Sequence, residues 1–575
     1  MPITFSRRQF VTLSVQAAAL ATAGRFTVLE SDAQTSKSAY QSLFSSLDHF
    51  IEQYMRDMNA PGLTFAMADR NGVQRVASYG FSDIESKLPV TSDQLFQIGS
   101  ITKSFVAICL LQLHDEGKLD LQKPISDYLP WFRVESSFVP ITTHHLLTHT
   151  AGIPGAAPIF LSDPSLKHRA ANAPGTYFHY CNTGFELLGY LLWTLDTRPI
   201  GECFRSRIFL PLGMTQSEPI ITLDIRDRVA MNYNAFQRDR PYPRYGRLSE
   251  APSIISTDGA GCIASTPRDM ALYAQMIANH GVGPKGRLLS EKSFALFSSP
   301  HIKAEEFGST AGYGYGIAVD TLDGHTILRH TGGMVSFASA LQVDIDEGVG
   351  AFASINAMQG YRPNPVVQYA IQLMRAQRSG KSLPEAPKST PPSFVENASQ
   401  YAGVYTGTNG RKWEFLGEGN SLFLIHEGKR IPVETVVGEK MFTIRHPAFD
   451  RFALTFGHAK SDDPKSPVVE CAWGKDWFTN EKYTGPKTFD YPQEWNQFVG
   501  HYHNENPWIG SVRIVVRKGK LMIDGIVPLE PTIDGAFYLR DEEHSPEWIR
   551  FADIVNSKAM RLKSSGEDMW RVMAD

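Results

Sequence analysis

The stretch IGSITKSF, residues 98–105, places Ser100 three residues before Lys103 at the start of an apolar segment. The segment predicts a buried helix from about Ile101 to Glu116, with Gly117 as its C-terminal stop. Residues three apart share a helix face, so the Lys103 amine can reach the Ser100 hydroxyl. A serine hydroxyl needs a base to become a nucleophile, and a lysine is a base only when burial keeps it neutral. Since Ser-x-x-Lys occurs by chance about once in a chain of this length, the rest of the sequence must decide.

Length and composition indicate a multidomain globular protein. The chain has 575 residues, of which 42% are hydrophobic and 20% are charged. A chain this long exceeds one ordinary core and predicts two or three domains. The formal net charge of −4 gives no indication of a nucleic-acid partner.

Residues 1–33 resemble a twin-arginine-type signal peptide and leader. The paired arginines of SRRQFV (6–11) precede TLSVQAAALATAG, which is shorter than the roughly 20 apolar residues that span a bilayer. Ala21-Thr22-Ala23 fits a cleavage site, and a basic start before an ordinary helix is the alternative. We therefore expect export to the periplasm. No cysteine follows the apolar run, so no stable membrane anchor is expected. The five cysteines are scattered and predict buried free thiols rather than a disulfide framework.

Strand signals come from both ends of the next region, 38–378. GLTFAMAD (62–69) and VQRVASYG (73–80) flank Asn71-Gly72, a strong hairpin signal. Further strands are predicted at 314–320, 325–332, 337–346 and 348–357, followed by a helix over 365–377. The pattern predicts an α/β (α+β) domain with a mainly antiparallel five-stranded sheet, two strands coming from the N-terminal end and three from the C-terminal end, flanked by helices.

The proline- and serine-rich residues 379–394 predict a linker. Beyond it, YAGVY (401–405) recurs as FVGHY (498–502), and Phe442 and Phe537 hold similar places. This repeat predicts two small all-β antiparallel barrels, at 395–488 and 492–575, with one larger continuous barrel as the alternative. We also expect a loop from one barrel to narrow the catalytic cleft.

Two more elements carry reactive side chains. The first holds Tyr180-Cys181-Asn182, and the second is LRHTGG (328–333), which holds His330-Thr331-Gly332. A tyrosine beside a lysine ammonium can have a lowered pKa and relay protons, and an asparagine offers a donor and an acceptor to a substrate amide.

These three elements, in this order, resemble the serine β-lactamase and penicillin-binding-protein superfamily, and its class C β-lactamase-related branch in particular. Flanking segments such as LFQIGSITKSF and HHLLTHTAGIPG are also similar, so the resemblance covers about residues 40–375. It implies that Ser100 is acylated, that Lys103 is its proton partner and that Tyr180 is a second acid or base. It further implies a substrate-binding set of Asn182, His330, Thr331, Gly332 and Gly333, with an oxyanion hole formed by the N–H groups of Ser100 and Gly333.

One departure bears on the substrate. Lactamases and many penicillin-binding proteins have lysine where His330 stands, and histidine resembles the esterases and D-amino-acid peptidases of the branch. The layout with C-terminal barrels is similar to D-aminopeptidases with lipocalin-like barrels. We therefore expect a hydrolase of small D-amino-acid peptides or amides, with an esterase or a β-lactamase as alternatives. A slowly acylating penicillin-binding or cell-wall sensor protein is the alternative of another class.

The expected partners are a small-molecule or short peptide substrate and no nucleic acid, and a homodimer is left open. No cofactor is expected. His145 and His149, four residues apart, form a weak metal motif because no glutamate stands between them and the segment already belongs to the resemblance.

Overall fold

The computed structural model describes residues 29–30, 40–161, 167–235, 248–358, 362–388, 391–436, 441–461, 463–539 and 544–573. The predicted signal peptide therefore lies outside the described residues, except for the last part of the leader. There, β1 (Leu29–Glu30) pairs with β3 (Gly72–Asp83). Within the described parts of the chain, none of the helices combines the length and apolar character needed to cross a bilayer.

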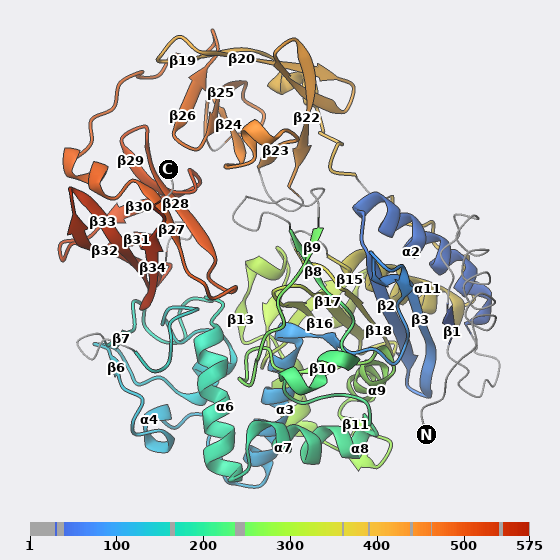
Figure 1. The fold of residues 1–575 in the computed structure, drawn as a ribbon. Coiled ribbons are helices and arrows are strands. Elements are labelled where there is room, and N and C mark those ends of the chain that lie inside the picture. Colours follow the sequence, from blue (N-terminus) through green and yellow to red (C-terminus); the bar gives the residue numbers. More distant parts are fainter. Residues whose placement is uncertain are drawn as a thin grey trace, which may run out of the picture.

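The N-terminal domain is built on one large antiparallel sheet (Figure 1). Its strands run in the order β1, β3, β2 (Gly62–Asp69), β18 (Val349–Ile355), β17 (Ala338–Asp344), β16 (His325–Gly333), β15 (Ala318–Leu322), β14 (Gly312–Tyr313) and β13 (Ile302–Lys303), with β4 (Leu88–Pro89) beside β3. The predicted hairpin is confirmed as β2 and β3, and its strands join those from the other end of the domain through the pairing of β2 with β18. The sheet is larger than the five predicted strands, because the C-terminal end supplies β15 as well as β16, β17 and β18, and because short strands extend the sheet on both sides.

Each face of the sheet buries a different core, because side chains alternate along a strand. One face packs Ala338, Ala340 and Ala353 against α2 (Phe44–Met58) and α11 (Asn364–Arg378). The opposite face packs larger residues such as Leu341, Val343 and Phe352 into the core that holds α3 (Thr102–Asp115). The small residues on one face of the sheet thus allow α2 and α11 to pack close to it. On the opposite face, the buried α3 holds the Ser100 segment against the sheet.

The remaining helices form a second layer beside α3. They are α4 (Ile125–Tyr128), α5 (Thr143–Leu147), α6 (Asn182–Asp196), α7 (Ile200–Phe204), α8 (Leu210–Leu212), α9 (Pro267–Ala278) and α10 (Glu291–Ser298). Short strand pairs brace this layer: β5 (Phe96–Gln97) with β10 (Ala264–Ser265), β6 (Val134–Glu135) with β7 (His168–Arg169), β8 (Tyr233–Ala235) with β9 (Leu248–Glu250), and β11 (Val282–Gly283) with β12 (Gly286–Arg287). All five cysteines are buried and free, as predicted.

Two closed eight-stranded antiparallel barrels follow, so the reading as one larger barrel is wrong. Barrel 1 comprises β19 (Gly403–Gly407), β20 (Lys412–Glu418), β21 (Ser421–His426), β22 (Lys429–Thr435), β23 (Phe442–Ile444), β24 (Leu454–His458), β25 (Val468–Trp473) and β26 (Asp476–Thr479). Barrel 2 comprises β27 (Gly500–His503), β28 (Ser511–Arg517), β29 (Lys520–Ile523), β30 (Val527–Pro531), β31 (Phe537–Leu539), β32 (Trp548–Val555), β33 (Lys558–Ser564) and β34 (Glu567–Arg571).

The internal repeat has a structural counterpart in a buried tyrosine on the first strand of each barrel. The Tyr405 hydroxyl donates to the Tyr401 carbonyl at 3.1 Å, and the Tyr502 hydroxyl donates to the Phe498 carbonyl at 2.9 Å. In each barrel this hydrogen bond therefore ties the turn that precedes the first strand to that strand. Barrel 2 lies beside the part of the N-terminal domain that carries β6, β7 and α6 (Figure 1). There, the turn at Gly566 lies against the side chains of Pro158 and Leu161.

Candidate active site

The Ser100 segment and the end of β16 meet backbone to backbone. Ser100 lies in a single 3₁₀ turn, Gly99–Ile101, immediately before α3. Gly99 has a φ of +52°, and a Cβ there would lie 2.7 Å from the Gly333 carbonyl oxygen. A Cβ on Gly332 would lie only 1.8 Å from the Ile98 carbonyl oxygen. Glycine is therefore required on both sides of this contact, which brings the first and third sequence motifs together.

Lys103 lies one helical turn beyond Ser100 and is fully buried. Its Nζ donates to Ser100 Oγ at 3.0 Å, to Asn182 Oδ1 at 2.8 Å and to the Ala260 carbonyl at 2.9 Å. Burial lowers the pKa of Lys103 to about 7, against the opposing effect of the Asp258 and Glu186 carboxylates. A substantial fraction of this amine is therefore neutral at physiological pH and able to accept a proton from Ser100.

Tyr180 faces the same hydroxyl from the end of the segment that leads into α6. Its ring centroid lies 4.9 Å from Lys103 Nζ, and the Ser100 hydroxyl tends to lower its pKa. Burial outweighs that effect and raises the pKa of Tyr180 well above its usual value. The lowered pKa that a neighbouring ammonium can cause is therefore not found: the phenol keeps its proton at neutral pH, which suits the acid of the two predicted roles.

Asn182 is the first residue of α6, and its position is fixed at the helix start. The Cys181 side chain caps the helix by accepting from the Gly184 N–H. The Asn182 amide carbonyl is occupied by Lys103, as described above, so the side-chain NH₂ group is the part left to face a substrate. The structure thus places Asn182 beside the lysine, and its contact with a substrate stays a prediction.

His330 is almost completely buried, with an exposed fraction of 2%, and both ring nitrogens have protein partners. Nδ1 lies 2.6 Å from the Thr331 carbonyl, which can only accept, so Nδ1 carries the proton. Nε2 then accepts from the Tyr313 hydroxyl at 2.9 Å. Burial and the Lys103 charge lower the pKa of His330 to about 3, so the imidazole is neutral. It gives no positive charge to a substrate carboxylate.

A pocket of about 450 Å³ opens between these elements. Six of the eight predicted site residues line it, namely Ser100, Tyr180, His330, Thr331, Gly332 and Gly333, while Lys103 and Asn182 lie behind Ser100. Phe307 and Met358 add apolar walls, and Glu306, Arg329 and Arg362 add charge. All described lining residues belong to the catalytic domain, so a barrel loop that narrows the cleft stays a prediction.

Three participants could not be assigned from the sequence. Ala260 contributes a carbonyl to Lys103, and Tyr313 fixes His330, as described above. His149 has a left-handed backbone with φ +57°, its ring packs at a tilt against Tyr180 with the ring centroids 4.3 Å apart, and its Nδ1 accepts from the Cys181 N–H at 2.9 Å. His149 lies in HHLLTHTAGIPG and Tyr313 in YGYGIAV, two segments that resemble the family, and this resemblance gave neither residue a role.

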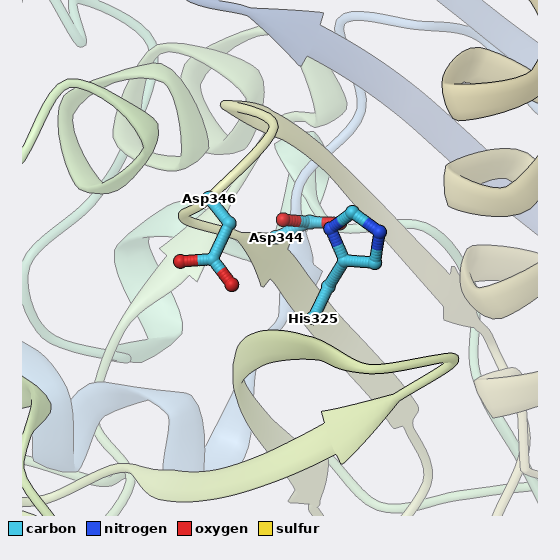
Figure 2. Close-up of side chains that lie close together, drawn as sticks. All are labelled: His325, Asp344 and Asp346. Carbon is cyan, nitrogen blue, oxygen red and sulfur yellow. The ribbon is translucent and has the colours of Figure 1, made fainter. Parts of the chain in front are cut away.

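His145 and His149, which have the spacing of a weak metal motif, form hydrogen bonds to other parts of the protein instead. α5 ends at Leu147, so His145 and His149 do not share a helix face, and their Nδ1 atoms bond to Thr142 and Cys181. Among the described residues, His325, Asp344 and Asp346 bring possible ligand atoms within 4.8 Å of one another (Figure 2).

That group occupies the opposite end of β16 from the active site. His325 and Gly333 are the first and last of the nine residues of β16, and the eight steps between them span about 26 Å at the usual rise per residue. Asp344 already pairs with Arg375 at 3.3 Å, and Asp346 accepts from the Thr326 N–H at 2.7 Å. The guanidinium supplies the positive charge that the buried carboxylate needs, which favours a structural ion pair over a metal centre.

Comparisons with known proteins agree over the catalytic domain. The beta-lactamase family model matches residues 47–375. Penicillin-binding protein 4 of Amycolatopsis lactamdurans is 30% identical over 309 residues, covering 51% of this chain and 79% of that protein. Esterase EstB of Burkholderia gladioli is 29% identical over 324 residues, covering 48% and 80%. The octameric penicillin-binding protein homologue of Pyrococcus abyssi shares the fold, with a TM-score of 0.53 at 24% identity over 76% of this chain and 100% of that one.

Proposed function

The chain belongs to the beta-lactamase family and is a serine hydrolase, and on this premise we propose that Ser100 attacks small amides or esters to form an acyl-enzyme. The observation that carries the proposal is the buried Lys103 amine, 3.0 Å from Ser100 Oγ and with a pKa of about 7. A lysine in this state can remove the serine proton without first losing one to solvent.

The proton transfers follow from the two pKa shifts. As the Oγ–carbon bond forms, the Oγ proton passes to Lys103, and the N–H groups of Ser100 and Gly333 stabilise the charge on the carbonyl oxygen. Tyr180, which holds its proton, donates it to the leaving nitrogen or oxygen as that bond breaks. The proton on Lys103 then passes to the Tyr180 oxygen. In the second half of the reaction, water attacks the acyl carbon as the neutral Lys103 amine takes the water proton, and Lys103 returns that proton to Ser100 Oγ as the carbon–Oγ bond breaks.

For the substrate, we propose peptides or amides that contain D-amino acids. The similarity to a penicillin-binding protein over most of that protein's length supports this class. The 450 Å³ pocket suits a small substrate, and the neutral His330 gives little attraction to a free carboxylate. An esterase is the second candidate, favoured by the same neutral His330 and by the similarity to EstB.

Export to the periplasm is also a proposal. Its support is the order of basic, apolar and small residues in the stretch from Ser6 to Ala23. Fractionation of cells that produce the full chain, with Arg7 and Arg8 each replaced by lysine as the control, tests it. Retention of the wild-type protein in the cytoplasm would contradict the proposal.

Labelling with a fluorophosphonate, followed by peptide mapping, tests the catalytic assignment. We expect Ser100 to be the labelled residue and Ser100→Ala to lose labelling and turnover while keeping its fold. A parallel panel of p-nitrophenyl esters and D-amino-acid anilides identifies the substrate class. Repeated product release identifies a hydrolase, whereas release of a single equivalent favours the slowly acylating sensor. Full activity in a folded Ser100→Ala protein would refute the assignment.

A further inference from the structure

One side chain of barrel 2 reaches the segment that carries Tyr180. Glu547, just before β32, accepts through Oε1 from the Gly155 N–H at 2.5 Å and from His179 Nε2 at 3.1 Å. Its other oxygen, Oε2, accepts from the Ser565 hydroxyl of the same barrel at 2.5 Å. The carboxylate therefore joins the barrel to two points of the catalytic domain that are far apart in sequence.

Both points lie directly against the proposed acid. His179 precedes Tyr180, and its N–H donates to the carbonyl of His149, whose ring packs against the Tyr180 ring. The Gly155 carbonyl accepts from the Asn182 N–H at 2.7 Å and from the Thr183 N–H at 3.1 Å. A Cβ on Gly155 would lie 2.6 Å from the Tyr180 carbonyl, so these backbones are in direct contact.

We propose that Glu547 is a positioning residue, supplied by the C-terminal barrel, that holds Tyr180 and Asn182 in their catalytic geometry. The inference rests on the proposed function and extends it by making barrel 2 part of the reaction's framework. Barrel 2 does not need to enter the pocket for this role, because it acts on the backbone behind Tyr180.

The chemistry of Glu547 suits such a role. Burial would raise its pKa, but the hydrogen bonds from His179, Ser565 and Gly155 outweigh burial and hold the pKa below its usual value. The group is therefore a carboxylate at neutral pH, and hydrogen bonds to a charged acceptor are shorter and stronger than neutral ones. Removing it leaves the Gly155 N–H, in a largely buried interface, without its partner.

A matched control lies in the same interface. The Asn172 side chain donates to the His544 carbonyl at 2.7 Å, which also ties barrel 2 to the catalytic domain. Asn172→Ala therefore weakens docking without removing the carboxylate beside Tyr180. Glu547→Ala removes a docking contact and the carboxylate beside Tyr180 together. Glu547→Gln keeps an oxygen that can accept from the Gly155 N–H.

The test measures kcat and KM for a D-amino-acid anilide, whose leaving amine must be protonated, together with fluorophosphonate labelling and the unfolding temperature in full-length variants. We expect Glu547→Ala to lower kcat by about tenfold or more with little change in KM, since a small misplacement of an acid slows the chemical step strongly. Glu547→Gln should restore much of kcat, and Asn172→Ala should keep kcat near wild type even where its unfolding temperature falls. His179→Ala combined with Glu547→Ala should cost less than the product of the two single losses.

The following outcomes would contradict a positioning role for Glu547. Wild-type kcat in Glu547→Ala, or an equal loss in Asn172→Ala, would overturn it and assign the contact to docking alone. If Glu547→Ala does not fold, a strictly multiplicative loss in the Glu547→Gln and His179→Ala pair overturns it instead. Failure of the proposed function is recognised separately, because wild-type protein would then not label at Ser100.

Discussion

We expect the pH dependence of hydrolysis to report the protonation of Lys103. Only the neutral amine can accept the Ser100 proton, and burial lowers its pKa to about 7. Lowering the pH through this value protonates the base, so activity falls on the acid side. Tyr180, whose pKa burial raises, keeps its proton over the same interval and adds no basic limb below pH 9.

The magnitude follows from the fraction of neutral amine. With a pKa of about 7, that fraction is about one half at pH 7 and about one hundredth at pH 5, so kcat/KM should fall about fiftyfold between them. Between pH 7 and pH 9 it should rise only about twofold. The buried histidines cannot produce this limb, because burial lowers the pKa of His330 to about 3 and that of His149 well below its usual value.

Glu186 needs a separate control, since burial raises its pKa to about 7 as well. Its carboxylate favours the ammonium form of Lys103. We therefore expect Glu186→Gln to keep the acid limb and to move it to lower pH.

The assay is kcat/KM for p-nitrophenyl acetate from pH 5 to pH 9 at constant ionic strength, read at the isosbestic wavelength of nitrophenol. A profile that is flat between pH 5 and pH 8 would refute the reasoning. So would an acid limb that disappears in Glu186→Gln while activity remains, because Glu186 and not Lys103 would then be the titrating group.

Three further changes test the site. Gly332→Ala places a methyl carbon 1.8 Å from the Ile98 carbonyl oxygen. We expect a loss of about 1–3 kcal/mol or more in unfolding free energy, measured by denaturant titration, together with lower activity; unchanged stability would contradict the close contact. His330→Lys should raise the kcat/KM ratio for carboxylate-bearing over uncharged anilides, and an unchanged ratio would show that this position does not select for charge. Tyr180→Phe should lower kcat on the order of a hundredfold or more, as loss of an acid does; wild-type kcat would assign the proton transfer to another group.

The parts of the site that carry a local pattern were predictable from sequence. Ser100 and Lys103 lie about one helical turn apart, so their spacing predicted the contact between them. Tyr180 and Asn182, which lead into and begin α6, were assigned through the family resemblance. The hairpin around Asn71-Gly72 and the strands over 325–357 followed from turn residues and apolar runs.

Other features depend on contacts that leave no local pattern. The Ala260 carbonyl reaches Lys103 from a distant loop, and any residue there could provide it. β13 and β14 are two residues long, too short to show an alternation of side chains. The pKa of Tyr180 is raised because burial, a property of the assembled domain, outweighs its neighbours.

The pairing of β2 with β18, which joins residues 63 and 355, affects how the chain is made. A ribosome adds about 5–20 residues per second, so the interval between these two strands takes roughly 15–60 s to synthesise. Throughout that time a hairpin of β2 and β3 would expose the unpaired backbone N–H and C=O groups that β18 later pairs with, and unpaired edges of this kind template aggregation. The yield of the protein in a producing cell should therefore depend on chaperones that shield this nascent edge more than on the stability of the finished domain.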